Sequence, residues 1–210
     1  MGHLVHHGLA RQTSRRGVMQ YTDFLNWVDM PKFALACHNI CHQTVLNEST
    51  NRMMKEKFII AAMQLSNHTK NIDWADERDF DVKFTAWTDG EIEVKTGNEP
   101  MFSAKTGKPK KQISLKLKNV YESKNQRTSL DKDFDHLMIV QIKGKFAVAF
   151  VDYATVKANL KQLTDGFLVK LTHDQINIVY ERDMRKEPTA WTIDLNPKTW
   201  VIDQLVKAGV

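Results

Sequence analysis

Two carboxylates and a lysine stand close together near the middle of the sequence, at Asp81, Glu93 and Lys95. Carboxylate oxygens are the ligands that a hard cation such as Mg²⁺ prefers. A lysine two positions beyond Glu93 points the same way as that glutamate if the segment is a strand, because strand side chains alternate between faces. It can then orient an attacking water or stabilise the charge that grows on a phosphate. These residue types are the set that metal-assisted phosphodiester hydrolysis needs.

The segment from 79 to 97 predicts a β-hairpin that gathers these residues on one face. Apolar and polar residues alternate on both sides of Thr88-Asp89-Gly90, which is a tight-turn signal. A turn centred on Asp89 pairs Lys83 with Lys95. The polar face then carries Asp79, Asp81, Lys83, Thr85, Glu91, Glu93 and Lys95, and the apolar face carries Val82, Phe84, Ala86, Ile92 and Val94. A hairpin whose polar face is merely solvated is the alternative interpretation.

The order of Asp81, an apolar strand, a turn and then Glu93-Val94-Lys95 resembles the PD-(D/E)xK motif of the restriction-endonuclease-like superfamily of nucleases. The resemblance covers residues 50–155. It implies a mixed β-sheet flanked by helices in the order α-β-β-β-α-β. It also implies that Asp81 and Glu93 bind Mg²⁺, with Mn²⁺ expected to substitute. The activity it implies is that of an endonuclease acting on DNA, of the restriction, phage or repair type, with Asp81, Glu93 and Lys95 as the catalytic residues.

Two positions of this motif stay open. Phe80 stands where many members have proline, and Asp79 competes with Asp81 as the first acid. Many members add a metal-binding glutamate from the helix before the hairpin. Glu56 is the candidate, and Asp76 and Glu77, which lie nearer in sequence, are the alternatives. Glu56 lies on the opposite side of its helix from the apolar stripe, which predicts an outward-facing side chain.

The periodicity of the remaining chain predicts helices before the hairpin and a mixture of elements after it. Helices are expected over residues 22–28, 31–44, 51–65, 152–163 and 197–207, and strands over 112–118, 137–140, 146–151, 167–171, 176–180 and 191–195. A helix is the alternative for 112–118. This order is typical of an α/β fold with a mixed central sheet. We expect a disordered arm (1–18), a nuclease core with N-terminal helices (19–165), and a small strand-rich C-terminal tail with a helix that packs on the core (166–210).

A cationic stretch follows the hairpin. Residues 105–127 contain eight basic residues against the single acid Glu122, in a chain whose formal net charge is +5. Lysines of this kind would contact DNA phosphates and carry no sequence information. The expected DNA-binding residues are Lys83, Lys105, Lys108, Lys110, Lys111, Lys116, Lys118 and Arg127. A solvated loop is the alternative interpretation of this stretch.

Other features restrict the class of protein. The chain lacks GxxxxGK[ST] and GxGxxG loops, which argues against a nucleotide cofactor, and it lacks an apolar run long enough to span a membrane. Its two cysteines indicate a reducing compartment. We expect a cytoplasmic protein of a bacterial or phage-infected cell. The acid-free segment 1–18 leaves an organellar presequence, or a later start at Met19, as alternatives.

Three further expectations concern ligands and partners. Cys37, His38, Cys41 and His42 have the spacing of ligands on one helix, but a zinc site usually needs four converging ligands. We therefore interpret the cysteines as core residues with surface histidines beside them. Double-strand cleavage generally uses two active sites, so we expect a homodimer. The alternative function is that of a non-catalytic DNA-binding protein with the same fold or basic surface.

Overall fold

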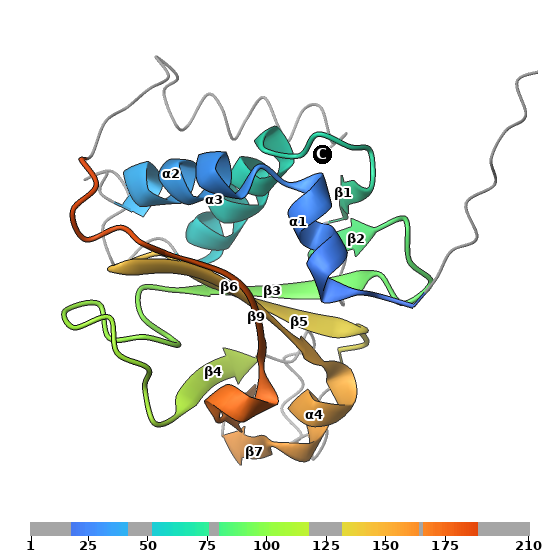
Figure 1. Cartoon of the computed structure of the whole chain (residues 1–210). Coiled ribbons are helices and arrows are strands. Elements are labelled where there is room, and N and C mark those ends of the chain that lie inside the picture. The colour runs from blue at the N-terminus through green and yellow to red at the C-terminus, as the bar shows by residue number, and fades with distance from the viewer. Residues whose placement is uncertain (1–17, 42–51, 76–79, 118–131, 164–165, 189–210) are drawn as a thin grey trace, which may run out of the picture.

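The computed structural model describes residues 18–41, 52–75, 80–117, 132–163 and 166–188 (Figure 1). Several sequence predictions fall outside these ranges. They are the arm over 1–17, the residues Asp76, Glu77, Asp79, Lys118 and Arg127, the strand over 191–195 and the helix over 197–207.

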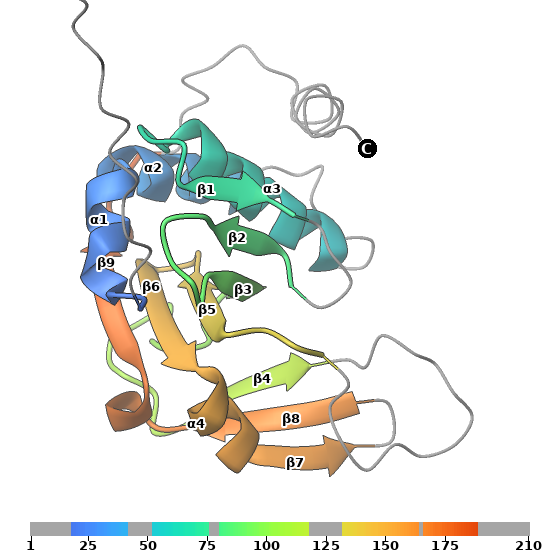
Figure 2. The same cartoon turned by 90° about the vertical axis from the view of Figure 1, so that its right-hand side faces the viewer.

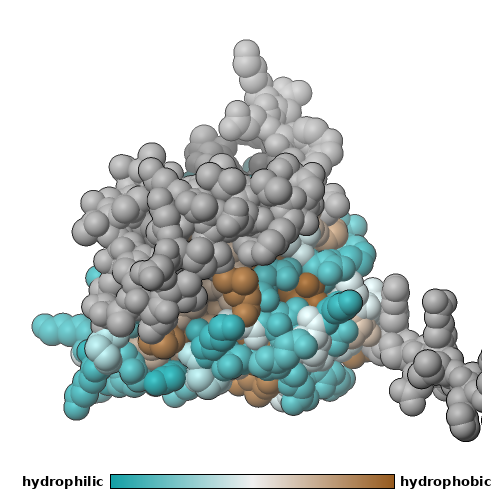
Figure 3. Space-filling model, turned by 90° about the horizontal axis from the view of Figure 1, so that it is seen from above, coloured by the Kyte–Doolittle hydropathy of each residue, from teal (hydrophilic) through white to brown (hydrophobic). Residues whose placement is uncertain are grey.

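Helices from the N-terminal part cover one face of a β-sheet (Figure 1). They are η1 (Tyr21–Asp23), α1 (Phe24–Trp27), α2 (Met30–Cys41) and α3 (Arg52–Leu65). Pro31 stands in the first turn of α2, where its missing N–H is not needed. The Asp29 side chain accepts a hydrogen bond from the Lys32 backbone N–H at 3.0 Å and so caps this helix. From the helical side the described surface is mainly hydrophilic with small separate hydrophobic patches (Figure 3).

The central sheet has six strands in the order β1-β2-β3-β5-β6-β9. Their bounds are β1 (Ile72–Trp74), β2 (Val82–Phe84), β3 (Glu91–Gly97), β5 (His136–Gln141), β6 (Lys145–Asp152) and β9 (Asn177–Asp183). Strands β3 and β5 are parallel, and the other neighbours are antiparallel. The predicted α/β fold with a mixed sheet flanked by helices is confirmed. No helix in the described ranges is long and apolar enough to cross a membrane.

A smaller sheet covers the opposite face of the central sheet (Figure 2). It has the order β4-β8-β7, with β4 (Ile113–Leu117), β7 (Leu160–Leu163) and β8 (Gly166–Leu171). Leu137 and Ile139 of β5 belong to the apolar core on this side, together with Val169 and Leu171 of β8. The central sheet is therefore buried on both faces, which explains why β5 and β6 are continuous apolar runs.

Strand β4 confirms the strand expected over 112–118, and it is the element that the described residues contain between β3 and β5, where the resemblance implies a helix. The helix expected over 152–163 ends earlier: α4 spans Tyr153–Ala158, and the chain then continues into β7. The Asp152 side chain caps α4 by accepting from the Thr155 N–H at 2.8 Å. A short turn, η3 (His173–Gln175), precedes β9.

The hairpin register also differs from the prediction. Lys83 pairs with Glu91 instead of Lys95, because β2 stops at Phe84 and a wide turn follows. The turn is drawn inward: Trp87 is buried, with its ring centroid 4.3 Å from that of Trp27. Gly90 fits because a Cβ there would stand 2.1 Å from the Phe84 carbonyl oxygen. The shift is an even number of residues, so odd positions still share one face.

Candidate active site

The candidate site lies where β2 begins, beside the part of β3 that has no strand paired on that side among the described residues. Within the described ranges, β2 pairs with β3 only at Ile92 and Glu91. At the next edge position, the Val94 N–H donates to Asp81 Oδ2 at 2.7 Å. The Val94 carbonyl accepts from Lys95 Nζ at 3.0 Å. The side chains of Asp81 and Lys95 thus take the two hydrogen bonds of Val94 that a neighbouring strand would otherwise form. Both side chains therefore lie at the same edge of the sheet.

Glu93 is the most deeply buried charged residue of this site. Its side chain has no exposed surface, and its Oε1 lies 2.7 Å from Lys95 Nζ. Leu137, its partner on β5, belongs to the apolar core beneath the small sheet. A carboxylate in such surroundings must be paired, because an isolated buried charge is very unfavourable. The predicted proximity of Glu93 and Lys95 is therefore a direct ion pair.

Glu56 joins the same cluster from helix α3, where the sequence predicted an outward-facing side chain. Its Oε1 lies 3.3 Å from Lys95 Nζ, and its side chain is only 23% exposed. The outward prediction was wrong because α3 is buried on more than one side: every residue from 58 to 63 is buried between α2, β1 and β3. Ile59 and Ile60 stand one turn after Glu56, so this side of the helix also faces the protein.

The environment shifts the protonation equilibria of three groups in this cluster. Burial, together with the charge of Glu93, raises the pKa of Asp81 to about 7, although Lys95 and the Val94 N–H oppose the rise. Burial also raises the pKa of Glu56 above its ordinary value, against the lowering effect of Lys95. Burial lowers the pKa of Lys95, but Glu93, Glu56 and Asp81 outweigh it and raise that pKa above its ordinary value. Negative charge is thus in excess here.

Lys132 is a member of the site that the sequence analysis missed. Its Nζ lies 2.7 Å from both oxygens of Glu93. The residue stands just before β5, the strand that runs parallel to β3. The sequence did show a basic residue shortly before the strand expected over 137–140. That signal could not be used, because it points to the site only once β5 is known to pair in parallel with β3.

The three carboxyl groups fit a hard divalent cation by their chemistry, since Mg²⁺ prefers oxygen ligands. Asp81 comes from the start of β2, Glu93 from β3 and Glu56 from α3, so the donors surround the open edge of β3. Within the described ranges, no three His, Cys, Asp or Glu side chains are already arranged around a single metal position. The ammonium groups of Lys95 and Lys132 stand among these carboxylates instead.

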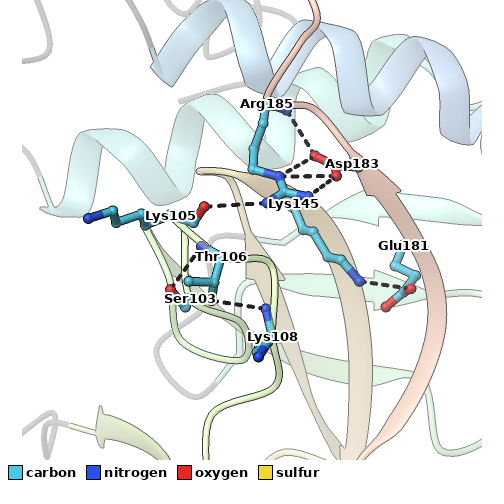
Figure 4. A network of polar contacts seen from close by, with 8 residues as sticks. All are labelled: Ser103, Lys105, Thr106, Lys108, Lys145, Glu181, Asp183 and Arg185. Atoms are coloured by element: carbon cyan, nitrogen blue, oxygen red, sulfur yellow. Dashed lines mark hydrogen bonds and ion pairs between the residues drawn. The ribbon is translucent and has the colours of Figure 1, made fainter.

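The expected DNA-binding lysines are not gathered at this site. Lys105 and Lys108 lie in a loop at the end of the sheet where β3 and β5 finish (Figure 4). There the Lys105 carbonyl accepts from Arg185 Nη1 at 3.3 Å. Lys83 forms an ion pair with Glu91 at 2.9 Å. The remaining described ones are Lys110 and Lys111 in the same loop and Lys116 on β4.

The histidine and cysteine group on α2 shows no sign of a metal site among the described side chains. Cys37 is buried in the core, as predicted. His38 is buried as well, so its predicted place on the surface was wrong. Its ring Nε2 lies 3.2 Å from the Glu187 carbonyl oxygen, because the chain after β9 returns across this helix.

No protein-family model and no curated protein matches this chain. Among solved structures, it is similar to one described as a restriction endonuclease in complex with substrate DNA. The sequence identity is 12% and the TM-score is 0.43, with 85% of this chain and 91% of that chain covered. At this distance the likeness assigns no role to any residue.

Proposed function

We propose that this protein is a Mg²⁺-dependent endonuclease that hydrolyses phosphodiester bonds in DNA. The observation that carries the proposal is the convergence of Asp81, Glu56 and Glu93 with Lys95 at the open edge of β3. Burial raises the pKa values of Asp81 and Glu56, and the charge of Glu93 adds to both rises, so a bound cation would favour the ionised forms of these carboxyl groups. Groups with shifted pKa values gather at functional sites more often than elsewhere.

In this proposal some residues of the site bind the cation, and one contacts the attacking water or the phosphate. Asp81, Glu93 and Glu56 would hold the cation. A bound divalent cation would supply charge neutralisation at the scissile phosphate and would acidify a water molecule. Lys95 carries an ammonium group whose pKa is raised, so it stays charged and can donate to the attacking water or to the phosphate. Its contacts with Glu93 and Glu56 hold it at the carboxylates.

DNA affinity would come from one basic residue near the site and from others farther away. Lys83 stands two residues after Asp81 on β2, with its side chain 45% exposed, so it can reach a phosphate near the site. Lys105, Lys108, Lys110, Lys111 and Lys116 would contact phosphates farther away, and Lys118 and Arg127 complete the expected set outside the described residues. Two copies of the chain would be needed to cut both strands at once, so we include a homodimer in the proposal.

Cleavage of supercoiled plasmid DNA with and without Mg²⁺ tests this function. We expect nicked or linear product only with Mg²⁺ or Mn²⁺, and a loss of at least about a hundredfold in rate for Glu93→Gln and for Lys95→Met. Glu181→Gln and Lys145→Met are matched controls, because this ion pair lies at the other end of the sheet. If the wild type cleaves none of supercoiled, linear and branched DNA, the proposal that the protein is an endonuclease is wrong. If a folded Glu93→Gln variant cleaves DNA at the normal rate, the proposed site is wrong.

One observation favours a second function, that of a non-catalytic DNA-binding protein. Both Glu93 oxygens are already engaged by the Lys132 ammonium at 2.7 Å, as in a protein that has replaced its metal with an internal cation. Such a protein would bind DNA equally well in EDTA and in Mg²⁺. It would leave the plasmid uncut under every metal condition.

A further inference from the structure

The Lys132 ammonium group contacts both oxygens of the Glu93 carboxylate, which is shielded from solvent. Its Nζ lies 2.7 Å from each Glu93 oxygen, and the glutamate side chain is fully buried. The lysine side chain itself is 15% exposed. Charge-assisted hydrogen bonds of this length are among the stronger ones in proteins. Lys132 is outside the motif formed by Asp81, Glu93 and Lys95.

We propose that Lys132 is a displaceable counterion, which holds the cation position on Glu93 and gives it up when a divalent cation binds. This inference rests on the proposed function, because it requires Glu93 to be a metal ligand. It assigns Lys132 a positioning role in metal loading, and it makes the metal-free arrangement of the carboxylates a distinct, closed state of the site.

Geometry makes the two cations mutually exclusive. A Mg²⁺ ion stands about 2.0–2.1 Å from a carboxylate oxygen. An ammonium group that bridges both Glu93 oxygens occupies the space from which such an ion would approach. Two positive charges a few ångströms apart in a weakly screened interior also repel each other strongly. The lysine must therefore leave the carboxylate before the ion can take its place.

Lys132 can move more easily than Lys95. When Glu93 is taken by a metal, Lys95 keeps two other partners, the Glu56 carboxylate at 3.3 Å and the Val94 carbonyl at 3.0 Å. Among the described residues, both hydrogen bonds of the Lys132 ammonium are to Glu93. A lysine also has a flexible four-carbon stem. Displacement therefore separates one side chain from the site and leaves the other in position.

The backbone of Lys132 is held by a contact that does not involve its ammonium group. Its carbonyl accepts a hydrogen bond from the Tyr153 hydroxyl at 3.3 Å. The Tyr153 ring packs edge-on against Phe134, with ring centroids 4.9 Å apart, and Phe134 is buried in the core. The released ammonium group would thus stay close to the carboxylates, where it can meet the phosphate of a bound DNA strand.

The first test uses the unaltered protein and needs no activity. Lysines are acylated for short times in EDTA and in saturating Mg²⁺, without DNA, and the labelled sites are measured by mass spectrometry. We expect labelling of Lys132 to rise several-fold with Mg²⁺, because its amine is released from Glu93. Lys161, which is exposed on β7 of the small sheet, is the internal control and should not change. An unchanged or lower rate at Lys132 would overturn the inference.

The second test measures metal affinity by titration calorimetry with MgCl₂ alone. A competing internal cation reduces the apparent affinity by the fraction of molecules in which it occupies the site. We therefore expect Lys132→Met to bind Mg²⁺ at least about tenfold more tightly than the wild type. Lys161→Met, which removes the same charge elsewhere, should match the wild type. Equal or weaker binding by a folded Lys132→Met would contradict the inference.

The two proposals fail in different ways. A wild type that binds no Mg²⁺ and cuts no DNA defeats the proposed function and this inference with it. A wild type that cuts DNA with Mg²⁺, but whose Lys132 labelling does not respond to the metal, defeats only the inference. If Lys132→Met does not fold, the labelling experiment on the wild type decides.

Discussion

Two groups of charged residues stand in different parts of the same sheet, and they behave in opposite ways. At the edge of β3, burial and the nearby Glu93 raise the pKa of Asp81 to about 7. At the end of β9, hydrogen bonds from Arg185 hold the pKa of Asp183 well below its ordinary value (Figure 4). Both are aspartates with a basic residue nearby. The difference is that Asp81 is buried among other carboxylates, whereas Asp183 is 46% exposed.

The two groups of charged residues differ in how far water reaches them. Lys145 and Glu181, next to Asp183, form an ordinary ion pair at 3.0 Å with the glutamate 47% exposed. Pairs of this kind contribute little and are screened by salt. In the β3 cluster each carboxylate depends on a few ammonium groups because water is excluded.

The largest effect is expected from Glu93→Ala. This variant leaves the Lys95 and Lys132 ammonium groups without their shared buried carboxylate, and breaking a buried pair in this way costs roughly 3–5 kcal/mol. We expect the free energy of unfolding in urea, followed by tryptophan fluorescence, to fall by that amount. A loss under about 1 kcal/mol would show that the cluster behaves like an exposed pair.

The next effect concerns the pH dependence of the metal-free protein. The pKa of Asp81 is higher in the folded state than in the unfolded state, so its protonated form favours folding. Its contribution is complete below about pH 4 and is lost as the pH rises towards 7, with a size on the order of 4 kcal/mol. We expect urea unfolding in EDTA to show this decline.

Asp81→Asn provides the control for that measurement, because its amide oxygen can still accept from the Val94 N–H. The variant should flatten the decline between pH 4 and 7 and should be more stable than the wild type at pH 8. Asp183→Asn should leave the decline in place. A wild-type curve that rises over this range would refute the buried, acid-rich description of the site.

A smaller effect should identify the third carboxylate of the cation site. A ligand at a hundred times its dissociation constant stabilises the folded state by about 2.7 kcal/mol. We expect Mg²⁺ to raise the melting temperature of the wild type and to raise that of Glu56→Gln clearly less, because Glu56 faces the cluster through Lys95. Glu187→Gln, an acid paired with Arg182 near the end of the described chain, is the control. If Mg²⁺ raises the melting temperatures of Glu56→Gln and Glu187→Gln equally, Glu56 is not a ligand of the cation.

The smallest effect is expected from Glu181→Ala. This change breaks the exposed pair with Lys145, so the loss of stability should be about 0–1 kcal/mol at low salt and should disappear in about 1 M NaCl. Urea unfolding at two salt concentrations measures it. A salt-resistant loss as large as that of Glu93→Ala would erase the distinction between the two groups.

The sequence predicted the parts of the site that follow from strand periodicity. Parity placed Glu93 and Lys95 on one face, and this holds although the turn is wider than expected and the pairing is shifted. Parity could not show that Leu137, the partner of Glu93 on β5, lies in an apolar core shared with β4 and β8, because these two strands are far apart in sequence and pair only in the folded chain. The full burial of Glu93 was therefore not predictable.

The missed residues depended on contacts between distant segments. Glu56 was expected to face outward because one apolar stripe was used to orient α3, and the helix in fact packs against both α2 and the sheet. Lys132 lies 39 residues after Glu93, and only the parallel pairing of β5 with β3 brings it close. Long-range arrangements of this kind are not encoded in local periodicity.

Among the described residues, β3 has no strand paired beside Val94 on the β2 side, and this has a consequence for solubility. A strand edge with free N–H and carbonyl groups is a template on which a second chain can add a strand and begin to aggregate. Here the side chains of Asp81 and Lys95 occupy both backbone groups of Val94 and so block that edge. The residues proposed to act on DNA would thus also prevent another strand from pairing with this edge of the sheet. Variants that remove both side chains should therefore become prone to self-association as well as lose activity.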